Sequence, residues 1–231
     1  MYVDGGMGAY WCQWEAKLLT KDRIVRAATG IIEREGADAL SMRRVAAELG
    51  VAVMSLYNHV PSKAALLDAV AERILAGMSV PAGPALHWTE RARCLVRAFR
   101  EVANDYPRSV TLVLTRKVDA PSGMRPVEHA LAVAAEAGFD GETSVRIMRA
   151  LLAYAIGAQM REVGALKMLD YLRKDDPTGG PPRLDFLDPG QFPHVVALQQ
   201  DLLRHDPDTD FEFGLDLLLT AVDLLPRTAK G

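Results

Sequence analysis

The chain has 231 residues, of which 49% are hydrophobic and 25% are charged. This length accommodates one large domain or two modest ones with a full core, and the composition is that of a globular protein. The net charge of −3 argues against a protein that coats nucleic acid by bulk attraction.

The charge is distributed unevenly along the chain. Residues 21–63 carry seven Lys or Arg against five Asp or Glu, whereas residues 170–231 carry six against twelve. We therefore expect a polyanion, if one binds, to contact the first part of the chain.

The sequence lacks the usual signs of a membrane, secreted or metal-binding protein. No apolar run is long enough to span a bilayer, and the N-terminus has no basic segment followed by an apolar one, so we expect a cytoplasmic protein. Cys12 and Cys94 lie far apart with no cluster of Cys or His near either. We therefore expect free thiols, no metal site and no cofactor.

Almost every hydrophobic pattern in the chain has the three-to-four-residue spacing of a helix, which predicts an all-α fold. Residues 1–20 show no such period and are predicted to form an N-terminal arm, with Met7 as an alternative start. Gly36 is expected to end the first helix in the left-handed conformation, and Ser41 and Ser62 are expected N-caps. Residues 80–84 are predicted to form a linker, and the Pro- and Gly-rich residues 175–193 are predicted to form a long loop able to act as a lid. Helices are expected at about 22–35, 41–50, 53–59, 62–78, 89–106, 109–118, 126–138, 142–172, 194–203 and 209–225.

Residues 41–60, SMRRVAAELGVAVMSLYNHV, have the pattern of two short helices that meet across a tight turn. Ala46 is small where the second helix must approach, and Gly50 can adopt the positive φ that the turn needs. The apolar side of the pair is supplied by Val45, Leu49, Val51, Leu56 and Val60.

The side chains left outward on this motif suit a nucleic-acid duplex. Arg43 and Arg44 follow Ser41 in the first turn of one helix, where the free N–H groups and the helix dipole favour phosphate, and Lys63 repeats that arrangement further on. On the second helix, short side chains allow close approach, while hydroxyl, amide and ring groups can bond to bases or to backbone oxygens. These outward residues are Val53, Met54, Ser55, Tyr57, Asn58 and His59. The alternative is that the three helices only pack together and the tight turn is nothing more than a turn.

Residues 24–69 resemble the DNA-binding segment of the tetracycline-repressor (TetR) family. The matching stretch is ALSMRRVAAELGVAVMSLYNHVPSKAALLDAV, which includes the block LY-x-HV-x-x-K-x-ALLDA from Leu56 to Ala69. A weaker resemblance to the ligand-binding domain of the tetracycline repressors covers LAVAAEAGFD at 131–140 and FEFGLDLLL at 211–219.

The resemblance implies an N-terminal three-helix helix-turn-helix domain, joined by a long fourth helix to a C-terminal helical domain for ligand binding and dimerisation. The expected boundaries are 1–20 for the arm, 21–66 for the DNA-binding domain and 67–231 for the remainder. Such a protein binds a palindromic operator in double-stranded DNA as a homodimer and is released by a small-molecule effector. By the same resemblance Tyr57, His59 and Lys63 correspond to backbone contacts, whereas Arg43, Val53, Met54, Ser55 and Asn58 occupy positions able to meet bases.

The chain departs from the tetracycline repressors at the positions that hold a magnesium-chelated drug. Ala153 and Arg161 stand at two of the metal-associated positions, and Ala130 stands at a polar one. Because Arg161 would repel a chelated cation, we expect neither magnesium nor tetracycline binding.

A largely apolar effector is expected instead, since methionine and aromatic side chains recur on helices that should converge. For each of these residues the alternative is a place in the ordinary core. The candidates are Trp88, Phe99, Tyr106, Met124, His129, Met148, Gln159 and Met160.

The last expected helix has two apolar stripes side by side, one from Phe211 to Leu225 and one from Phe213 to Leu224. A helix that is apolar over so much of its surface must be covered, and a twofold partner is the expected cover. The alternative is complete burial within its own domain. The candidate interface residues are Val145, Leu152, Leu215, Leu217, Leu218 and Ala221.

Two other classes of function fit the sequence less well. An enzyme is not expected, because we find no nucleophile motif, no pair of metal ligands at helical spacing and no phosphate-binding glycine loop. An architectural DNA-binding protein would need more positive charge than this chain carries.

Overall fold

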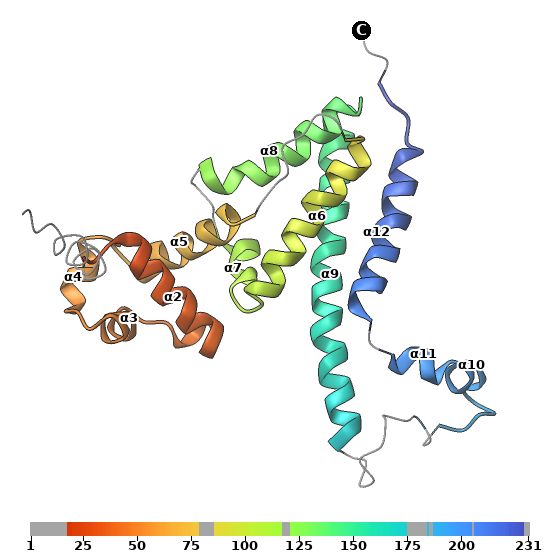
Figure 1. Ribbon diagram of the computed structural model, residues 1–231, viewed down its shortest axis with the longest axis horizontal. Helices are drawn as coiled ribbons and strands as arrows, with labels where there is room; N and C mark the ends of the chain where they lie inside the picture. The colour runs from red at the N-terminus through yellow and green to blue at the C-terminus, as the bar shows by residue number, and fades with distance from the viewer. Residues whose placement is uncertain are drawn as a thin grey trace, which may run out of the picture. The chain divides into compact units, whose positions relative to one another are not determined.

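The computed structural model describes residues 18–78, 86–116, 121–174, 184, 187–204 and 206–228. All regular secondary structure in these ranges is helical, which confirms the expected all-α class (Figure 1). The chain divides into two compact units. Unit 1 comprises Met1–Ser79 and Val102–Pro126, and unit 2 comprises Val80–Glu101 and Val127–Gly231. Most of the expected arm at 1–20 lies outside the described residues, and the boundaries at 20 and 66 remain predictions.

Three helices of unit 1 begin where a hydroxyl group caps the first turn. The Thr20, Ser41 and Ser62 hydroxyls accept hydrogen bonds from the backbone N–H three residues on, at 3.2, 3.2 and 3.1 Å. The two serine caps confirm the sequence prediction, whereas Thr20 was not foreseen. The elements of unit 1 are α2 (Lys21–Glu35), the 3-10 helix η1 (Ala37–Ala39), α3 (Met42–Leu49), α4 (Val53–Tyr57), α5 (Lys63–Ala76) and α7 (Val110–Thr115).

Two helix ends in unit 1 differ from expectation. Gly36 ends α2 with a φ of 92°, but its ψ of 163° is extended, so the expected left-handed helical stop is wrong. The extended ψ lets the chain leave α2 directly into η1. The next discrepancy is α4, which ends at Tyr57, two residues earlier than expected.

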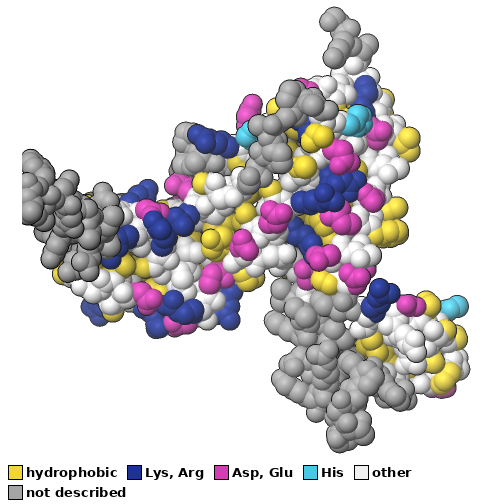
Figure 2. Space-filling model, viewed as in Figure 1, with side chains coloured by type: hydrophobic (Ala, Val, Ile, Leu, Met, Phe, Trp, Pro, Cys, Tyr) yellow, Lys and Arg dark blue, Asp and Glu magenta, His cyan; other side chains and the backbone are white. Residues whose placement is uncertain are grey.

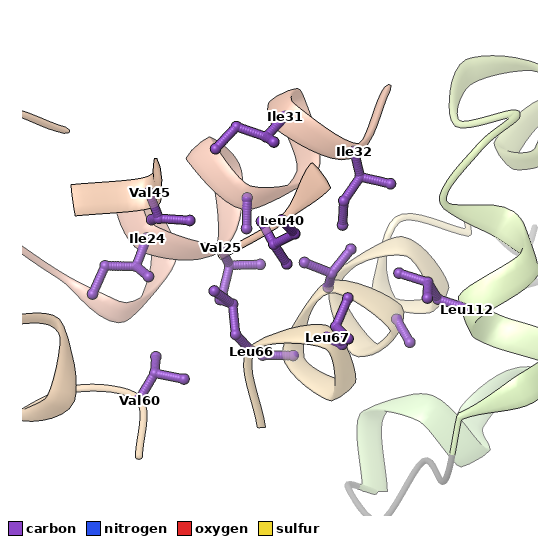
Figure 3. Close-up of a cluster of buried hydrophobic side chains, with 14 of the residues drawn as sticks. Ile24, Val25, Ile31, Ile32, Leu40, Val45, Val60, Leu66, Leu67 and Leu112 are labelled. Carbon is purple, nitrogen blue, oxygen red and sulfur yellow. The ribbon is translucent and has the colours of Figure 1, made fainter. Parts of the chain in front are cut away.

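The core of unit 1 gathers the apolar faces of α2, α3, α4 and α5, and α7 packs against α5 (Figure 3). Ile24, Ile31 and Ile32 of α2 are completely buried. Leu66 and Leu67 of α5 and Leu112 of α7 lie in the same cluster. The helix-turn-helix is therefore supported on its inner side by α2 and α5.

Unit 2 is built around the long helix α9, which lies beside α12 (Figure 1). No helix in the described ranges is long and apolar enough to cross a membrane. The expected linker at 80–84 and most of the expected loop at 175–193 lie outside the described residues. The remaining helices are α6 (Trp88–Asp105) and α8 (Pro121–Glu136), which each run across the division between the units, and α9 (Gly141–Lys174), α10 (Pro193–Ala197), α11 (Gln199–Leu203) and α12 (Pro207–Asp223).

Two expected helices in this half of the chain need correction. α8 begins at Pro121, so Pro126 lies inside the helix instead of at its start. Pro121 is the proline that suits the first turn of the helix, so the sequence pattern selected the wrong one. The single helix expected at 194–203 is interrupted at Leu198, whose φ of −106° and ψ of 14° separate α10 from α11.

Candidate functional site

The turn between α3 and α4 is closed by the backbone of Ala46, Ala47 and Gly50. Gly50 has φ 66° and ψ 35°, in the left-handed region, and its N–H donates to the Ala47 carbonyl at 3.2 Å. The Val51 N–H donates to the Ala46 carbonyl at 3.0 Å. A Cβ added at Gly50 would meet no atom within 4 Å, so the positive φ is what requires glycine here.

The inner side of the two helices is apolar, as the sequence predicts. Val45, Ala46, Leu56 and Val60 are buried. Leu49 and Val51 are partly buried and pack against the same cluster, so these side chains fix the face that α4 turns outward.

The outward face of this motif holds most of the side chains expected to contact DNA. Val53 and Ser55 are partly buried, which leaves only part of each side chain accessible. The exposed members are Ser41, Arg43, Arg44, Met54, Tyr57, Asn58, His59 and Lys63.

The cations on this surface are not equivalent. The Arg44 guanidinium lies 2.5 Å from the Glu35 carboxylate. By contrast, Arg43 and Lys63 make no ion pair within the part of the chain that the structure describes. Arg43 and Lys63 are therefore available to phosphate, whereas Arg44 must leave Glu35 to reach one. The sequence did not reveal this difference, because Glu35 belongs to the preceding helix.

The residues expected to bind an effector are spread over both units. Tyr106 and Met124 belong to unit 1 and the other six belong to unit 2. Tyr106 borders an open hollow of about 610 Å³ in unit 1, beside Asp22, Val25 and Arg73. Trp88 and Phe99 are buried, Met148 and Gln159 are partly buried, and Met124, His129 and Met160 are exposed.

Trp88 packs against residues of its own chain near the end of α12. Its ring meets Phe139 edge-on at 5.4 Å, and its indole N–H donates to Asp223 at 2.9 Å. The Arg227 guanidinium lies 3.8 Å from the Phe139 ring centroid and bonds to the same Asp223 carboxylate. These contacts account for Trp88 without a ligand.

The surface of α12 separates into a buried stripe and an exposed one. Phe211, Leu215 and Leu219 are almost completely buried in their own chain. Leu215 is therefore removed from the expected dimer interface, because it packs inside unit 2. The other expected interface residues are accessible in whole or part: Leu152, Leu217 and Ala221 are exposed, and Val145 and Leu218 are partly buried. Phe213 and Leu224 extend the exposed stripe, and hydrophobic side chains reach the surface along α12 (Figure 2).

A ladder of charges joins α6 to α12, and the sequence analysis missed it. Arg93 and Arg97 of α6 both bond to Glu212 of α12, Arg97 through two contacts of 2.8 Å. The hydrogen bond from Arg97 lowers the pKa of the Glu212 carboxyl, against the opposing effect of partial burial. The available signal was the spacing of both sets, with arginine at 93, 97 and 100 and acidic residues at 208, 212 and 216.

Arg100 ends this ladder in a more buried position. Its guanidinium lies 2.8 Å from Glu162 of α9 and 2.7 Å from Asp208, and it stacks 4.5 Å over the Phe211 ring. With its donors engaged in this way, Arg100 holds α6, α9 and α12 together.

No metal centre can be assembled from the described residues. Within those ranges no group of three or more His, Cys, Asp or Glu side chains is placed to hold a metal ion. Cys94 is a free, partly buried thiol, and Cys12 lies outside the described residues.

Comparison with known families matches both parts of the chain. A family model described as bacterial regulatory proteins of the tetR family matches residues 24–70. A second model, described as the tetracyclin repressor-like C-terminal domain, matches residues 80–223.

Individual relatives agree with these matches. The HTH-type transcriptional repressor DrrR1 of Streptomyces coeruleorubidus is 31% identical over 218 residues, which cover 92% of this chain and 80% of DrrR1. The class A tetracycline repressor protein from transposon 1721 of Escherichia coli is 30% identical over 62% of this chain and 67% of its own length. Among solved structures, apo ActR from Streptomyces coelicolor superimposes with a TM-score of 0.70 at 28% identity, covering 89% of this chain and 95% of ActR.

The family matches cover most of the chain, and they include the turn at Gly50 and the outward face of α4. The chain therefore belongs to the TetR family of helix-turn-helix transcriptional regulators.

Proposed function

We propose that this protein is a cytoplasmic repressor that binds a palindromic operator as a homodimer and is released by a small, largely apolar ligand. The observation that carries the proposal is the surface formed by α3 and α4. There the exposed Tyr57 of α4, followed directly by the exposed Asn58 and His59, accompanies two cations, Arg43 and Lys63, that have no acidic partner in the described ranges.

The residues of this surface are suited to two kinds of contact with DNA, with the phosphate backbone and with the bases. Arg43 and Lys63 stand near helix starts, where a cation and free N–H groups together favour phosphate. Asn58 can form paired hydrogen bonds to adenine, and Tyr57 and His59 can hold backbone oxygens. Phosphate contacts set the register, and the contacts of α4 with base edges select the sequence.

Two copies are needed because one α4 reads only half of a palindromic site. The exposed stripe of α12, with Leu217 exposed over 58% of its surface, supports self-association, since a stripe of this kind is costly in water. Leu152 and part of Val145 on α9 supply further apolar surface, so α9 and α12 of each copy are the proposed interface.

The proposed effector is an organic molecule held without a metal. Arg161 pairs with Asp210 at 3.1 Å, and a guanidinium beside a chelated cation would weaken its binding. Gln159 has a buried Oε1 atom with no hydrogen-bond partner among the described residues, so it could accept a hydrogen bond from a ligand. ActR is recorded in complexes with (S)-DNPA and with actinorhodin, which supports an organic effector for this chain too.

DNA binding is tested by fluorescence anisotropy with the full chain, comparing duplexes from its own upstream region with random duplexes at matched salt. Arg43→Ala removes a proposed phosphate contact, so it should weaken binding to both kinds of duplex alike and reduce the dependence of affinity on salt. Arg146→Ala is the matched control, since Arg146 is an exposed arginine of α9, outside the proposed DNA-binding surface, that pairs with Glu142 of its own helix. Equal affinity for upstream and random duplexes would contradict the proposal.

The effector is tested by calorimetric titration of metal-free protein with actinorhodin, and with tetracycline in the presence and absence of magnesium. A complete switch between DNA-bound and released states needs about 5.5 kcal/mol of preference for the released state. Magnesium-dependent, submicromolar binding of tetracycline would contradict the proposed pocket and leave the DNA-binding proposal unaffected.

A further inference from the structure

Met54 is a large hydrophobic side chain that the fold leaves in water. Its exposed fraction is 72%, the highest among the exposed large hydrophobic side chains of unit 1 in the described ranges. It lies on α4, whose inner side is anchored by the fully buried Leu56. A methionine this exposed contributes little packing energy to the isolated chain, which leaves its flexible apolar side chain available to whatever α4 contacts.

The neighbours of Met54 place it on the surface proposed to meet DNA. Residues three and four apart share a helix face, so Met54 lies alongside Tyr57 and Asn58, which are both exposed. Arg43 and Lys63, which have no acidic partner among the described residues, are exposed on α3 and at the start of α5 and belong to the same proposed DNA-binding surface. Because phosphate-binding groups accompany this face, duplex DNA is the occupant that fits it best.

The first two side chains of α4 are apolar. The N-cap is Ala52, which makes no side-chain cap, and Val53 and Met54 follow it, ahead of the partly buried Ser55. In the major groove each base pair presents hydrogen-bonding groups, and thymine alone adds an apolar group, the C5-methyl. Met54 has no hydrogen-bond donor and only a weak acceptor, so apolar contact with a thymine methyl is the recognition that suits it best.

We propose that Met54 is a specificity-determining residue that contacts the C5-methyl group of a thymine in each operator half-site. This inference rests on the proposed DNA-binding function and names the base that the start of α4 selects. The proposal predicts that Met54 recognises the thymine by apolar contact and not by a hydrogen bond. It also predicts that removing the methyl group of that thymine weakens the binding of the duplex.

The test replaces thymine by uracil, which removes only the methyl group and keeps the base pair. The full chain first selects its preferred sequence from a library of random duplexes, and each thymine of the selected half-site is then replaced in turn. Replacement at the contacted position in one half-site should weaken binding about fourfold, the equivalent of one buried methylene, and replacement in both should weaken it roughly fifteenfold. Replacement by 5-bromouracil should restore affinity, because bromine fills the space of the methyl group.

Variants then assign the effect to Met54. Met54→Ala should bind the thymine and uracil duplexes with equal affinity, whereas Met54→Leu should keep most of the discrimination. Leu114→Ala removes another exposed apolar side chain of unit 1, exposed over 42% of its surface against 72% for Met54, from α7, outside this surface, and should discriminate as the wild type does. Circular dichroism checks that each variant is folded, and Met54→Ser is a second truncation for the same comparison.

The outcomes separate this inference from the function on which it rests. Sequence-specific binding with no sensitivity to uracil at any position, or with equal sensitivity in Met54→Ala, overturns the role of Met54 and leaves DNA binding in place. Failure of the selection to enrich any sequence overturns both. If Met54 instead docks a protein partner, Met54→Ala will match the wild type in affinity and in discrimination, which also overturns the inference.

Discussion

Gly214 of α12 is packed so closely that a single methyl group there should change the stability of unit 2. A Cβ built on Gly214 would clash with the Tyr154 hydroxyl oxygen and lie 2.8 Å from two carbons of the same ring. The Tyr154 hydroxyl donates to the Phe211 carbonyl at 2.7 Å, so the ring is held in place and cannot simply swing aside. Gly214→Ala therefore has to displace either Tyr154 or the helix.

The sign of the effect follows from two opposing magnitudes. Alanine in place of glycine inside a helix normally stabilises a protein by roughly 0.5–1 kcal/mol. Overpacking a well-filled contact costs roughly 1–3 kcal/mol, and displacement of Tyr154 also loses a hydrogen bond. We expect Gly214→Ala to lower the free energy of unfolding by about 1–2 kcal/mol.

Urea denaturation followed by circular dichroism, at one protein concentration, measures this change as a shift of the midpoint. Gly30→Ala is the matched control, because the added Cβ inside α2 would meet only the mobile end of Arg34 at 3.3 Å. Tyr154→Phe removes the closest contact and the hydrogen bond that holds the ring, so it should relieve part of the clash, whereas Tyr154→Ala should turn Gly214→Ala into a stabilising change. A midpoint that rises as much in Gly214→Ala as in Gly30→Ala would refute the close contact.

Three further changes test other contacts. Leu217→Arg places a charge on the exposed stripe of α12, so sedimentation at micromolar concentration should show monomers that remain helical; a monomeric wild type would contradict the proposed interface. The pKa of Glu212 is lowered by its bond to Arg97, so this carboxylate stabilises the fold above the ordinary glutamate pKa of about 4.3, and the contribution is lost as the pH falls through the folded-state value. The thermal unfolding temperature of Glu212→Gln should therefore fall less steeply than that of the wild type as the pH decreases below about 4.3. Equal slopes for the two proteins would contradict the role given to the ion pairs between α6 and α12. Glu33 accepts the Ser109 N–H at 2.8 Å just before α7, so Glu33→Ala should cost about 1.5 kcal/mol in urea denaturation, and no loss would show that this hydrogen bond does not stabilise the fold.

The sequence predicted correctly those features that depend on residues only a few positions apart in the chain. Ser41 caps α3 because its hydroxyl lies three residues from the N–H that it accepts, and Gly50 turns the chain because its own φ is positive. The outward position of Tyr57 and Asn58 follows from helical spacing once Leu56 is assigned to the core. Short-range chemistry was therefore enough to locate the two helices and their turn, whereas their assignment to DNA binding rested on the family resemblance.

The parts that the sequence could not decide depend on segments far apart in the chain. Leu215 and Leu217 belong to two apolar stripes of one helix, and periodicity cannot say which stripe faces α9. The structure buries Leu215 and exposes Leu217, so only the second can serve an interface between copies. Arg43 and Arg44 are adjacent in sequence, yet only Arg44 meets Glu35, because that contact depends on how α2 packs beside α3.

The charged face of α6 shows why a pattern can be visible and still be misinterpreted. Arginines four residues apart usually mark a solvated surface, because exposed charges cost nothing to place. Here the acidic residues of α12 have matching spacing, and the two charged faces meet each other. Arg100 and Glu162 are mostly buried, and a buried charge without its partner is destabilising, so this pair restricts which arrangements of α6, α9 and α12 are allowed. Sequence reveals such a constraint only when both sets of charges are considered together.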